Sequence, residues 1–401
     1  MHILYIHQYF KTPYEPGATR TYWMSKALIE AGHDVTMITQ NKKATKDVEF
    51  KNIDGIEIIY VKNWYANDMT IPARIKSYFS FTVKSSVLAL KQQHIDLVIS
   101  TSTPLSVGLP ALLLKWFKGI PFLFEVRDLW PEVPIQMGAM KNPVIRWFAK
   151  YFEKTIYQNA RHIVALSPGM LDGVIKYVPE SKVSMISNMA KNDKFWPRPK
   201  NHEISKKYGL NNNSFKVIHF GAMGIANGLL YIMEAARIME LEKEISEIQF
   251  VFLGEGKAKK TCEDFVAKHN LKNVILLERV PMDITSEIVN ICDVSVVSFL
   301  NLPILATNSP NKLFDSLSAA KPVIVNSNGW TRNIVENHNC GAYVDPENPN
   351  EFVDLLLRWK NTPKLLNEMG INGRNLAETT YDKSILTKKF VDTIEKQFML
   401  K

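Results

Sequence analysis

The sequence predicts an α/β protein made of two doubly wound domains, each a parallel sheet covered by helices, facing each other across a cleft. Three observations support this fold class. The chain has 401 residues, too many for one ordinary core and suited to two domains of similar size. Short β-branched apolar runs alternate with helical patterns, and this series stops and begins again. Between the two series, at residues 190–205, lies a polar, proline-containing stretch without hydrophobic periodicity.

The elements follow in order. In the first series we expect strands at residues 3–6, 35–39, 57–61, 97–100, 121–126 and 162–166, with a helix at 20–31. In the second we expect strands at 216–220, 249–253, 273–277, 294–298 and 322–326, with a helix at 228–239. Alternation of this kind predicts parallel sheets covered on both faces. We therefore place one domain at 1–190 and another at 191–382, and expect 383–401 to form a helix that packs back on the first domain.

Composition limits the class of protein. Apolar residues make up 46% of the chain and charged residues 22%, as in soluble globular proteins. Three well-separated cysteines, none at metal-ligand spacing, indicate reduced thiols in a cytoplasmic protein. The start of the chain is too short for a signal sequence, and no run reaches the roughly 20 apolar residues of a spanning helix.

The net charge of +9 is concentrated in the first 190 residues, which hold 22 Lys and Arg against 15 Asp and Glu. A basic surface attracts phosphate groups of nucleic acid, anionic lipid or a charged substrate. Charge alone does not choose among these partners, and it is the only feature that favours nucleic acid, which we therefore do not expect as a partner.

In parallel sheets, ligands bind beyond the carboxyl ends of the strands. The segment 309–325, SPNKLFDSLSAAKPVIV, has the most informative residues there. Ser309 is expected to cap a helix that starts at Pro310, which leaves free N–H groups for an anion. Lys312 lies in the first turn and can reach a phosphate. Asp315, one turn further, can accept hydrogen bonds from a ribose diol, although a capped helix with an exposed Asp explains the pattern equally well.

Glycine loops follow the strands of the second series. Gly221, Gly224 and Gly228 stand between a strand and a helix, where the backbone can approach a pyrophosphate. Gly254 and Glu255 end the next strand, and Arg279 with Val280 follow the one after, placed to flank a nucleotide base. These loops contain neither G-x-G-x-x-G nor GK[ST], so they predict neither a nicotinamide dehydrogenase nor a Walker loop.

The first series carries its own candidate site. FEVRDLWPE, residues 124–132, ends a buried strand with charged residues, among them Arg127 and Asp128. One explanation is a structural ion pair of Arg127 with Asp128 or Glu132. The first loop holds Gly17 just before a helix, where backbone can touch phosphate or sugar, or form a simple turn.

The order of these segments resembles the retaining glycosyltransferases of family 4, and RDLWP is similar to a subgroup with bacterial N-acetylfucosamine-type transferases of capsule and O-antigen synthesis. The resemblance covers essentially the whole chain and is most specific at RDLWP and SPNKLFDSLSAAKPV. It implies the GT-B fold, with two Rossmann-like domains: an acceptor side at 1–190 and a nucleotide-sugar donor side at 191–382. It further implies a UDP-sugar donor, a saccharide acceptor that is polyprenyl-linked in many relatives, and retention without metal or other cofactor.

Residue by residue, Asp315 matches the second acid of the E-x7-E motif, which binds the donor ribose. The first acid falls at Thr307 and the usual loop Arg near Ile225, two departures from the family pattern. Lys312 is then the best candidate for the diphosphate charge, and Arg127 with Asp128 match a His-Asp pair that lines the sugar site. We expect catalytic roles for Arg127, Asp128 and Lys312. We expect donor binding by Gly17, Gly221, Gly224, Asn227, Gly254, Glu255, Arg279, Val280, Ser309, Pro310, Asn311, Lys312, Leu313 and Asp315.

Residues 143–160 form an amphipathic pattern with a basic stripe of Arg146, Lys150 and Lys154 beside aromatic residues. Such a helix suits an anionic membrane surface, and a second basic cluster lies at 74–91. The alternative is a core-facing helix with a solvated basic side. The membrane interpretation predicts a protein bound peripherally to the inner face of the cell membrane.

Two other functions stay open. A UDP-sugar epimerase of the same architecture would release and re-add UDP without an acceptor. An inactive nucleotide- or lipid-binding relative would fit the departures at Thr307 and Ile225.

Overall fold

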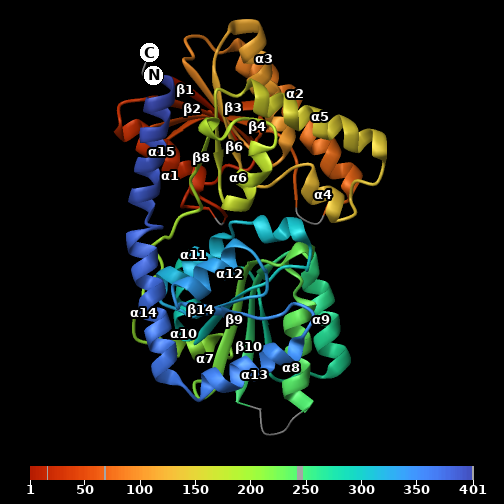
Figure 1. Cartoon of the computed structure of the whole chain (residues 1–401), viewed down its shortest axis with the longest axis vertical. Coiled ribbons are helices and arrows are strands. Elements are labelled where there is room, and N and C mark those ends of the chain that lie inside the picture. Colours follow the sequence, from red (N-terminus) through yellow and green to blue (C-terminus); the bar gives the residue numbers. More distant parts are fainter. Residues whose placement is uncertain (16, 67–68, 242–246, 400–401) are drawn as a thin grey trace. The chain divides into compact units, whose positions relative to one another are not determined.

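The structure is a computed structural model that describes residues 1–15, 17–66, 69–241 and 247–399 (Figure 1). It contains two compact units. The first consists of residues 1–187, 307–309 and 384–401, and the second of residues 188–306 and 310–383. Each is an α/β unit built on one sheet, which confirms the predicted fold class.

The first unit is built on an eight-stranded sheet in the order β3-β4-β2-β1-β5-β6-β7-β8. Its strands are β1 (His2–Ile6), β2 (Asp34–Asn41), β3 (Val48–Ile53), β4 (Ile56–Lys62), β5 (Leu97–Thr101), β6 (Phe122–Val126), β7 (His162–Ala165) and β8 (Val183–Met185). Its helices are α1 (Arg20–Glu30), α2 (Ile71–Lys91), α3 (Gly108–Lys118), α4 (Glu132–Gln136), α5 (Pro143–Asn159), α6 (Pro168–Ile175) and α15 (Lys383–Phe398).

One strand departs from the expected all-parallel sheet. β3 pairs antiparallel with β4, and the two form a hairpin at the sheet edge. The turn consists of Asp54 and Gly55, both with positive φ (53° and 89°), the geometry in which Asp-Gly joins two strands tightly. The other strands are parallel, and β5 and β6 are buried at every position because helices cover both faces.

The second unit is built on a six-stranded, fully parallel sheet in the order β11-β10-β9-β12-β13-β14. Its strands are β9 (Phe215–Ala222), β10 (Ile248–Glu255), β11 (Val274–Leu277), β12 (Val294–Val297), β13 (Val323–Val325) and β14 (Gly341–Tyr343). Its helices are α7 (His202–Lys207), α8 (Leu230–Leu241), α9 (Ala258–His269), α10 (Met282–Ile291), α11 (Asn311–Ser318), α12 (Trp330–Asn337), α13 (Pro349–Lys360) and α14 (Pro363–Thr379).

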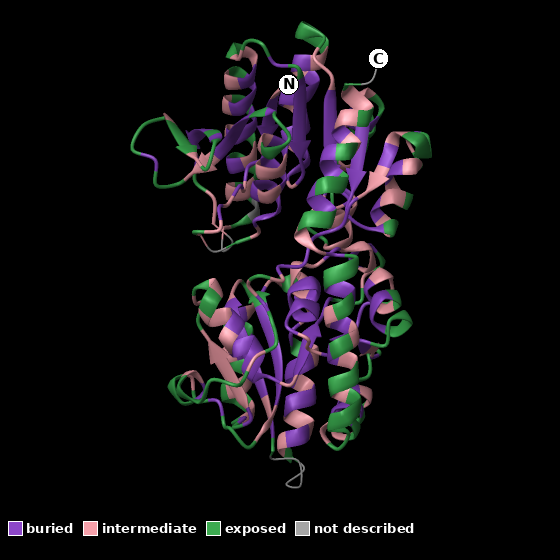
Figure 2. Cartoon of the chain, turned by 90° about the vertical axis from the view of Figure 1, so that its left-hand side faces the viewer, coloured by how far each residue is buried: buried purple, intermediate pink, exposed green. Residues whose placement is uncertain are grey.

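Two apolar clusters lie on the two faces of this second sheet. One joins α8 and α13 to strand residues such as Phe250, and the other joins α10 to residues such as Val251. Neighbouring strand residues thus serve opposite faces, as the strand period of two requires. Figure 2 shows the buried strands inside each unit and the exposed outer faces of the helices.

The cysteines, the long helices and the end of the chain complete the description. Cys262, Cys292 and Cys340 are all buried as free thiols. Within the described ranges, no helix is both long and apolar enough to cross a membrane. The helix expected at 383–401 is α15, which ends at Phe398, and residues 400–401 lie outside the described part.

Candidate active site

The candidate donor site of the second unit lies at the carboxyl ends of β9, β10 and β11, beside the start of α11. His219 in β9 and Lys312 in the first turn of α11 meet there, with Nζ of Lys312 3.0 Å from Nε2 of His219. Burial lowers the pKa of Lys312 to about 7. Burial and the neighbouring ammonium hold the pKa of His219 well below its ordinary value, so its imidazole is neutral at neutral pH.

The low pKa makes the charge of Lys312 sensitive to a nearby anion. A Lys with a pKa near 7 is half-charged at neutral pH and becomes fully charged when a diphosphate approaches. Gly221 adds no side chain here, and the nearest atom to a Cβ at that position would be Cε of Lys312, 4.0 Å away. The Lys312 ammonium therefore lies against bare backbone at the end of β9.

Asp315 is one turn further along α11 and is buried, with 6% of its surface exposed. Both of its carboxylate oxygens lie 3.0 Å from Nζ of Lys191, in the segment that precedes α7. Burial raises the pKa of Asp315, and the Lys191 ammonium partly offsets that effect. The sequence did not single out Lys191, because its partner lies 124 residues away along the chain.

The expected cap of α11 is wrong by one residue. The N-cap is Pro310 instead of Ser309, and Pro310 makes no side-chain cap hydrogen bond. Pro310 has an extended ψ of 127°, so helical geometry begins at Asn311. Ser309 is buried and groups with the first unit, whereas Asn311 and Leu313 lie in the first turn.

Local packing explains why glycine stands at several positions that the sequence analysis assigned to phosphate binding. A Cβ on Gly254 would lie 1.8 Å from the Gly221 carbonyl oxygen, and one on Gly256 2.3 Å from that of Met223. These glycines let the ends of β9 and β10 approach each other. They shape the loop edge whether or not a phosphate binds there.

The loop after β9 is held by Asn227. Its side-chain oxygen accepts a hydrogen bond from the Gly224 N–H at 3.0 Å, and its backbone oxygen accepts one from the Ser298 hydroxyl at 2.7 Å. Ile225, where the family Arg would fall, is 56% exposed. The Asn227 hydrogen bonds thus fix the loop, and the Ile225 side chain is exposed to solvent.

The remaining donor candidates lie at the ends of β10 and β11. Glu255 accepts a hydrogen bond from Lys259 at 2.8 Å, and Lys259 also contacts Glu278. Arg279 is exposed and Val280 packs partly against the second apolar cluster of this unit. Neighbouring parallel strands end on the same side of a sheet, so these residues lie on the same side as His219 of β9. Lys312 of α11 contacts His219 there.

The candidate site of the first unit lies at the carboxyl ends of β1, β5 and β6. Nη1 of Arg127 is 3.2 Å from Nε2 of His7, and the Arg127 N–H donates to the Ser102 hydroxyl at 2.9 Å. Burial raises the pKa of Asp128 to about 6, and Arg127 opposes that shift. Among the described residues the structural alternative, an Arg127 ion pair with Asp128 or Glu132, is not formed, and Glu132 instead contacts Lys150.

A buried ion pair supports the candidate site of the first unit. Arg20, the first residue of α1, donates to Glu125 in β6 at 2.8 Å and to the Ile186 carbonyl at 2.9 Å. Thr101 in β5 donates to the other Glu125 oxygen at 2.6 Å. The pair fixes α1 and β6 and so sets where Arg127 and Asp128 emerge. Gly17 lies in the exposed loop before α1 with φ of 147°, a conformation that favours glycine.

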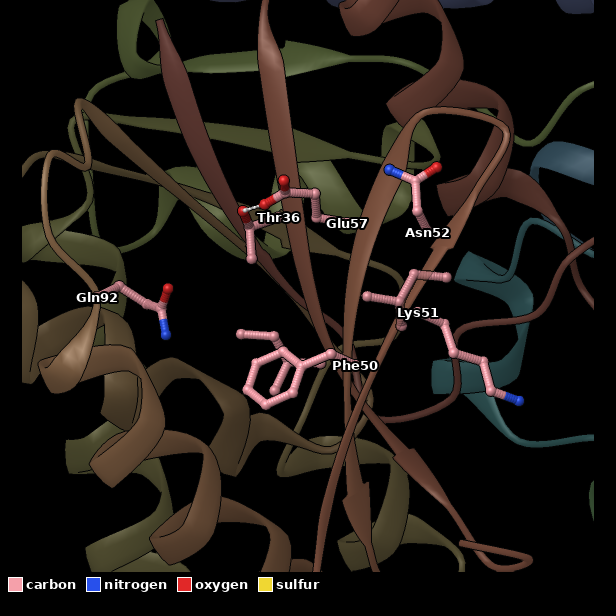
Figure 3. A pocket seen from close by; sticks show the side chains of 8 residues that line it. Thr36, Phe50, Lys51, Asn52, Glu57 and Gln92 are labelled. Carbon is pink, nitrogen blue, oxygen red and sulfur yellow. Dashed lines mark hydrogen bonds between the residues drawn. The ribbon is translucent and has the colours of Figure 1, made fainter.

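A hollow elsewhere in the first unit does not belong to this site. It has a volume of about 370 Å³ and lies between the β3–β4 hairpin, Thr36 of β2 and Gln92 (Figure 3). Thr36 and Glu57 stand near the amino ends of β2 and β4, whereas Arg127 and Asp128 follow the carboxyl end of β6. The hollow is therefore remote from the carboxyl ends of the strands, where ligands bind in parallel sheets.

Metal ligands do not gather in the described ranges. Nowhere there do three or more His, Cys, Asp or Glu side chains lie together in a way that could hold a metal ion.

Solved structures share this architecture over the whole chain. Sucrose-phosphate synthase from Thermosynechococcus elongatus superposes with a TM-score of 0.80 at 16% identity, over 99% of both chains. HepE from Anabaena, in complex with UDP and glucose, superposes with a TM-score of 0.71 at 14% identity, over 99% of this chain and 100% of that one. At this level of identity the likeness shows the fold alone, and that fold is GT-B.

Family models and curated relatives agree with the fold. Residues 17–189 match the model described as "Glycosyl transferase 4-like domain" and residues 200–376 the model "Glycosyl transferases group 1". The chain therefore contains these two glycosyltransferase domains. It is 24% identical to "Probable glycosyltransferase WbjE" of Pseudomonas aeruginosa over 79% of this chain and 78% of that protein. It is 22% identical to "Alpha-galactosylglucosyldiacylglycerol synthase" of Streptococcus pneumoniae over 66% and 68%.

Proposed function

We propose that this protein is a retaining glycosyltransferase that moves a sugar from a UDP-sugar to a saccharide carried on a polyprenyl lipid, in bacterial surface polysaccharide synthesis. The sugar we expect is an N-acetylated hexosamine or deoxyhexosamine. The observation that carries the proposal is the Lys312–His219 pair beside the start of α11, a cationic site at the carboxyl ends of the strands. The solved HepE complexes with UDP and with UDP-glucose support the choice of base.

The chemistry follows from where charge develops. The bond between the anomeric carbon and the diphosphate oxygen breaks, and negative charge grows on the leaving phosphate while positive charge grows on the sugar ring. Lys312 and the α11 N–H groups stabilise the phosphate charge more in the transition state than in the ground state. Asp315 accepts hydrogen bonds from the ribose, and Arg127 with Asp128 line the sugar and acceptor side.

The acceptor hydroxyl attacks the same face of the sugar, and its proton passes to the leaving phosphate oxygen. No protein base is required for that transfer, and the configuration is retained. The glycolipid in the name of the pneumococcal relative supports a lipid-borne acceptor.

A donor panel followed by product analysis tests the proposal. UDP-sugars should raise the melting temperature more than GDP- or dTDP-sugars, and intact mass analysis should show transfer to polyprenyl-linked saccharides. Incubation with donor alone separates the alternatives. A transferase gives slow hydrolysis, whereas appearance of an epimerised donor would show an epimerase, and absence of both binding and turnover would show an inactive relative.

A further inference from the structure

Three helices of the first unit carry an unusual density of exposed apolar side chains. On α2, Ile75, Phe79, Val83 and Val87 are 60%, 71%, 44% and 48% exposed, and they recur every four residues along one side of the helix. A regular helix rises about 1.5 Å per residue, so this stripe extends over roughly 18 Å. Apolar residues at helical spacing normally face a core, and these face outward.

The other two helices continue the pattern. On α3, Trp116 is 52% and Phe117 73% exposed. On α5, the first turns expose five large apolar side chains, which are Val144, Ile145, Trp147, Phe148 and Tyr151. The alternative of a core-facing α5 is wrong for this half of the helix, because the buried residues Glu153, Ile156 and Tyr157 all lie in its second half.

These helices form one layer. Each connects strands that progress in the same direction across the sheet, from β4 to β5, β5 to β6 and β6 to β7. Right-handed crossovers place such helices on one face. α3 packs against both α2 and α5, and Trp116 donates a hydrogen bond to Asn159 of α5 at 3.3 Å. Figure 1 shows α5 running out past the sheet on the side of α2 and α3.

The charge of this layer has one sign. α2 holds four basic residues and no acid, α3 holds two and no acid, and α5 holds three against the buried Glu153. Lys76, Lys118, Lys150 and Lys154 are exposed beside the apolar stripes. Surface apolar groups on a monomer are normally scattered, whereas here they are gathered and flanked by positive charge.

We propose that the outer faces of α2, α3 and α5, named here the basic apolar layer, form a docking surface for an anionic lipid bilayer. Its aromatic and aliphatic side chains enter the region between head groups and acyl chains, and its Lys and Arg side chains bind the anionic head groups. A protein partner would need no such uniform charge. The proposal goes beyond the transfer reaction and does not depend on which sugar is moved.

Vesicle co-sedimentation of the full chain tests the docking surface. Wild type should bind vesicles of phosphatidylcholine with phosphatidylserine at low salt, bind less at high salt, and bind pure phosphatidylcholine vesicles weakly. The variant Lys150→Glu/Lys154→Glu should lose at least about 25-fold in partition coefficient, since each basic residue contributes roughly fivefold. Lys268→Glu/Lys272→Glu, which makes the same change of charge on the second unit, is the matched control and should bind like wild type.

Substitutions of exposed apolar residues test the contributions of α2 and α5 to vesicle binding separately. Phe79→Ser on α2 and Phe148→Ser on α5 should each weaken vesicle binding, and their combination should weaken it further. Phe50→Ser removes a side chain that is at least as exposed, at 73%, but lies on β3, and it should leave binding unchanged. Melting temperatures should stay close to that of wild type because these side chains face solvent.

Each opposite result overturns the proposal in a defined way. Wild-type binding equal to that of Phe79→Ser excludes α2, and no binding of wild type to anionic vesicles at low salt excludes the bilayer altogether. A dimer in gel filtration that Phe79→Ser dissociates would show that a second copy covers the layer. In all three cases, transfer to a short water-soluble saccharide should persist, so failure here is distinct from failure of the proposed transferase.

Discussion

Nζ of Lys191 lies 3.0 Å from both carboxylate oxygens of Asp315, and this buried pair joins the segment before α7 to the helix of the candidate donor site. The pair holds the Asp315 carboxylate in one orientation. It also means that changing Asp315 affects two properties, because Lys191 then becomes a buried charge without its carboxylate.

We therefore predict that Asp315→Asn weakens donor binding by about 1–3 kcal/mol, the loss of charged hydrogen bonds to ribose hydroxyls. The melting temperature should fall as well, because Lys191 loses its counter-charge. Calorimetry with a UDP-sugar measures the first effect and thermal unfolding the second. If Asp315→Asn lowers the melting temperature but binds donor like wild type, Asp315 has a structural role only.

Lys312→Ala should lower kcat by a larger factor than it raises the donor KM, because negative charge on the leaving phosphate grows in the transition state. Steady-state kinetics with the donor identified in the panel give both constants. Arg279→Ala, at the end of β11, is a comparison for a cation that lies away from the reacting bond. An increase in KM with unchanged kcat would mean that Lys312 contributes only to ground-state binding.

Titration of Asp128 should lower kcat/KM on the acid side of the pH–rate profile. Its pKa is raised to about 6, so the carboxylate is present above pH 6 and is lost as the pH falls below it. We expect kcat/KM to fall about tenfold per pH unit below pH 6. Asp128→Asn should have low activity without that fall, while Asp172→Asn, an exposed Asp of the same unit, should keep the wild-type profile. A fall that survives in Asp128→Asn would assign it to another group.

Turnover should persist in EDTA, because the proposed site stabilises phosphate with Lys312 and helix N–H groups. The measurement is the transfer rate with excess chelator, compared with the rate after Mg²⁺ or Mn²⁺ is added back. Activity that disappears with chelator and returns with metal would contradict this mechanism.

The sequence was sufficient to place most strands of both sheets along the chain, because apolar periodicity is a local signal. It failed where the signal was weak or distant. β3 is a largely exposed edge strand without a clear apolar run, although the Asp54–Gly55 turn could have revealed its hairpin. α14 was missed despite Pro363 at its start, a known signal for the first helical turn.

The candidate residues were found from the sequence more easily than their partners were. Lys312 and Asp315 stand in a local motif, whereas His219 lies 93 residues from Lys312 and Lys191 lies 124 from Asp315. His7 is likewise 120 residues from Arg127. No local pattern encodes such pairs, since parallel strands bring together the ends of distant segments. For α5 the sequence left two interpretations open, because the apolar spacing of its exposed half equals that of a buried helix.

The most direct test of the account is the pH dependence of UDP-sugar binding, measured by calorimetry between pH 6.5 and 8.5. Lys312 has a pKa of about 7 in the free protein, and a bound diphosphate raises it, so above pH 7 the protein must take up a proton to bind donor. We predict roughly 20-fold weaker binding at pH 8.5 than at pH 6.5, with proton uptake, and a flat profile for Lys312→Arg, which stays charged. Wild-type binding that is independent of pH, without proton uptake, would contradict the assignment of Lys312 to the donor diphosphate.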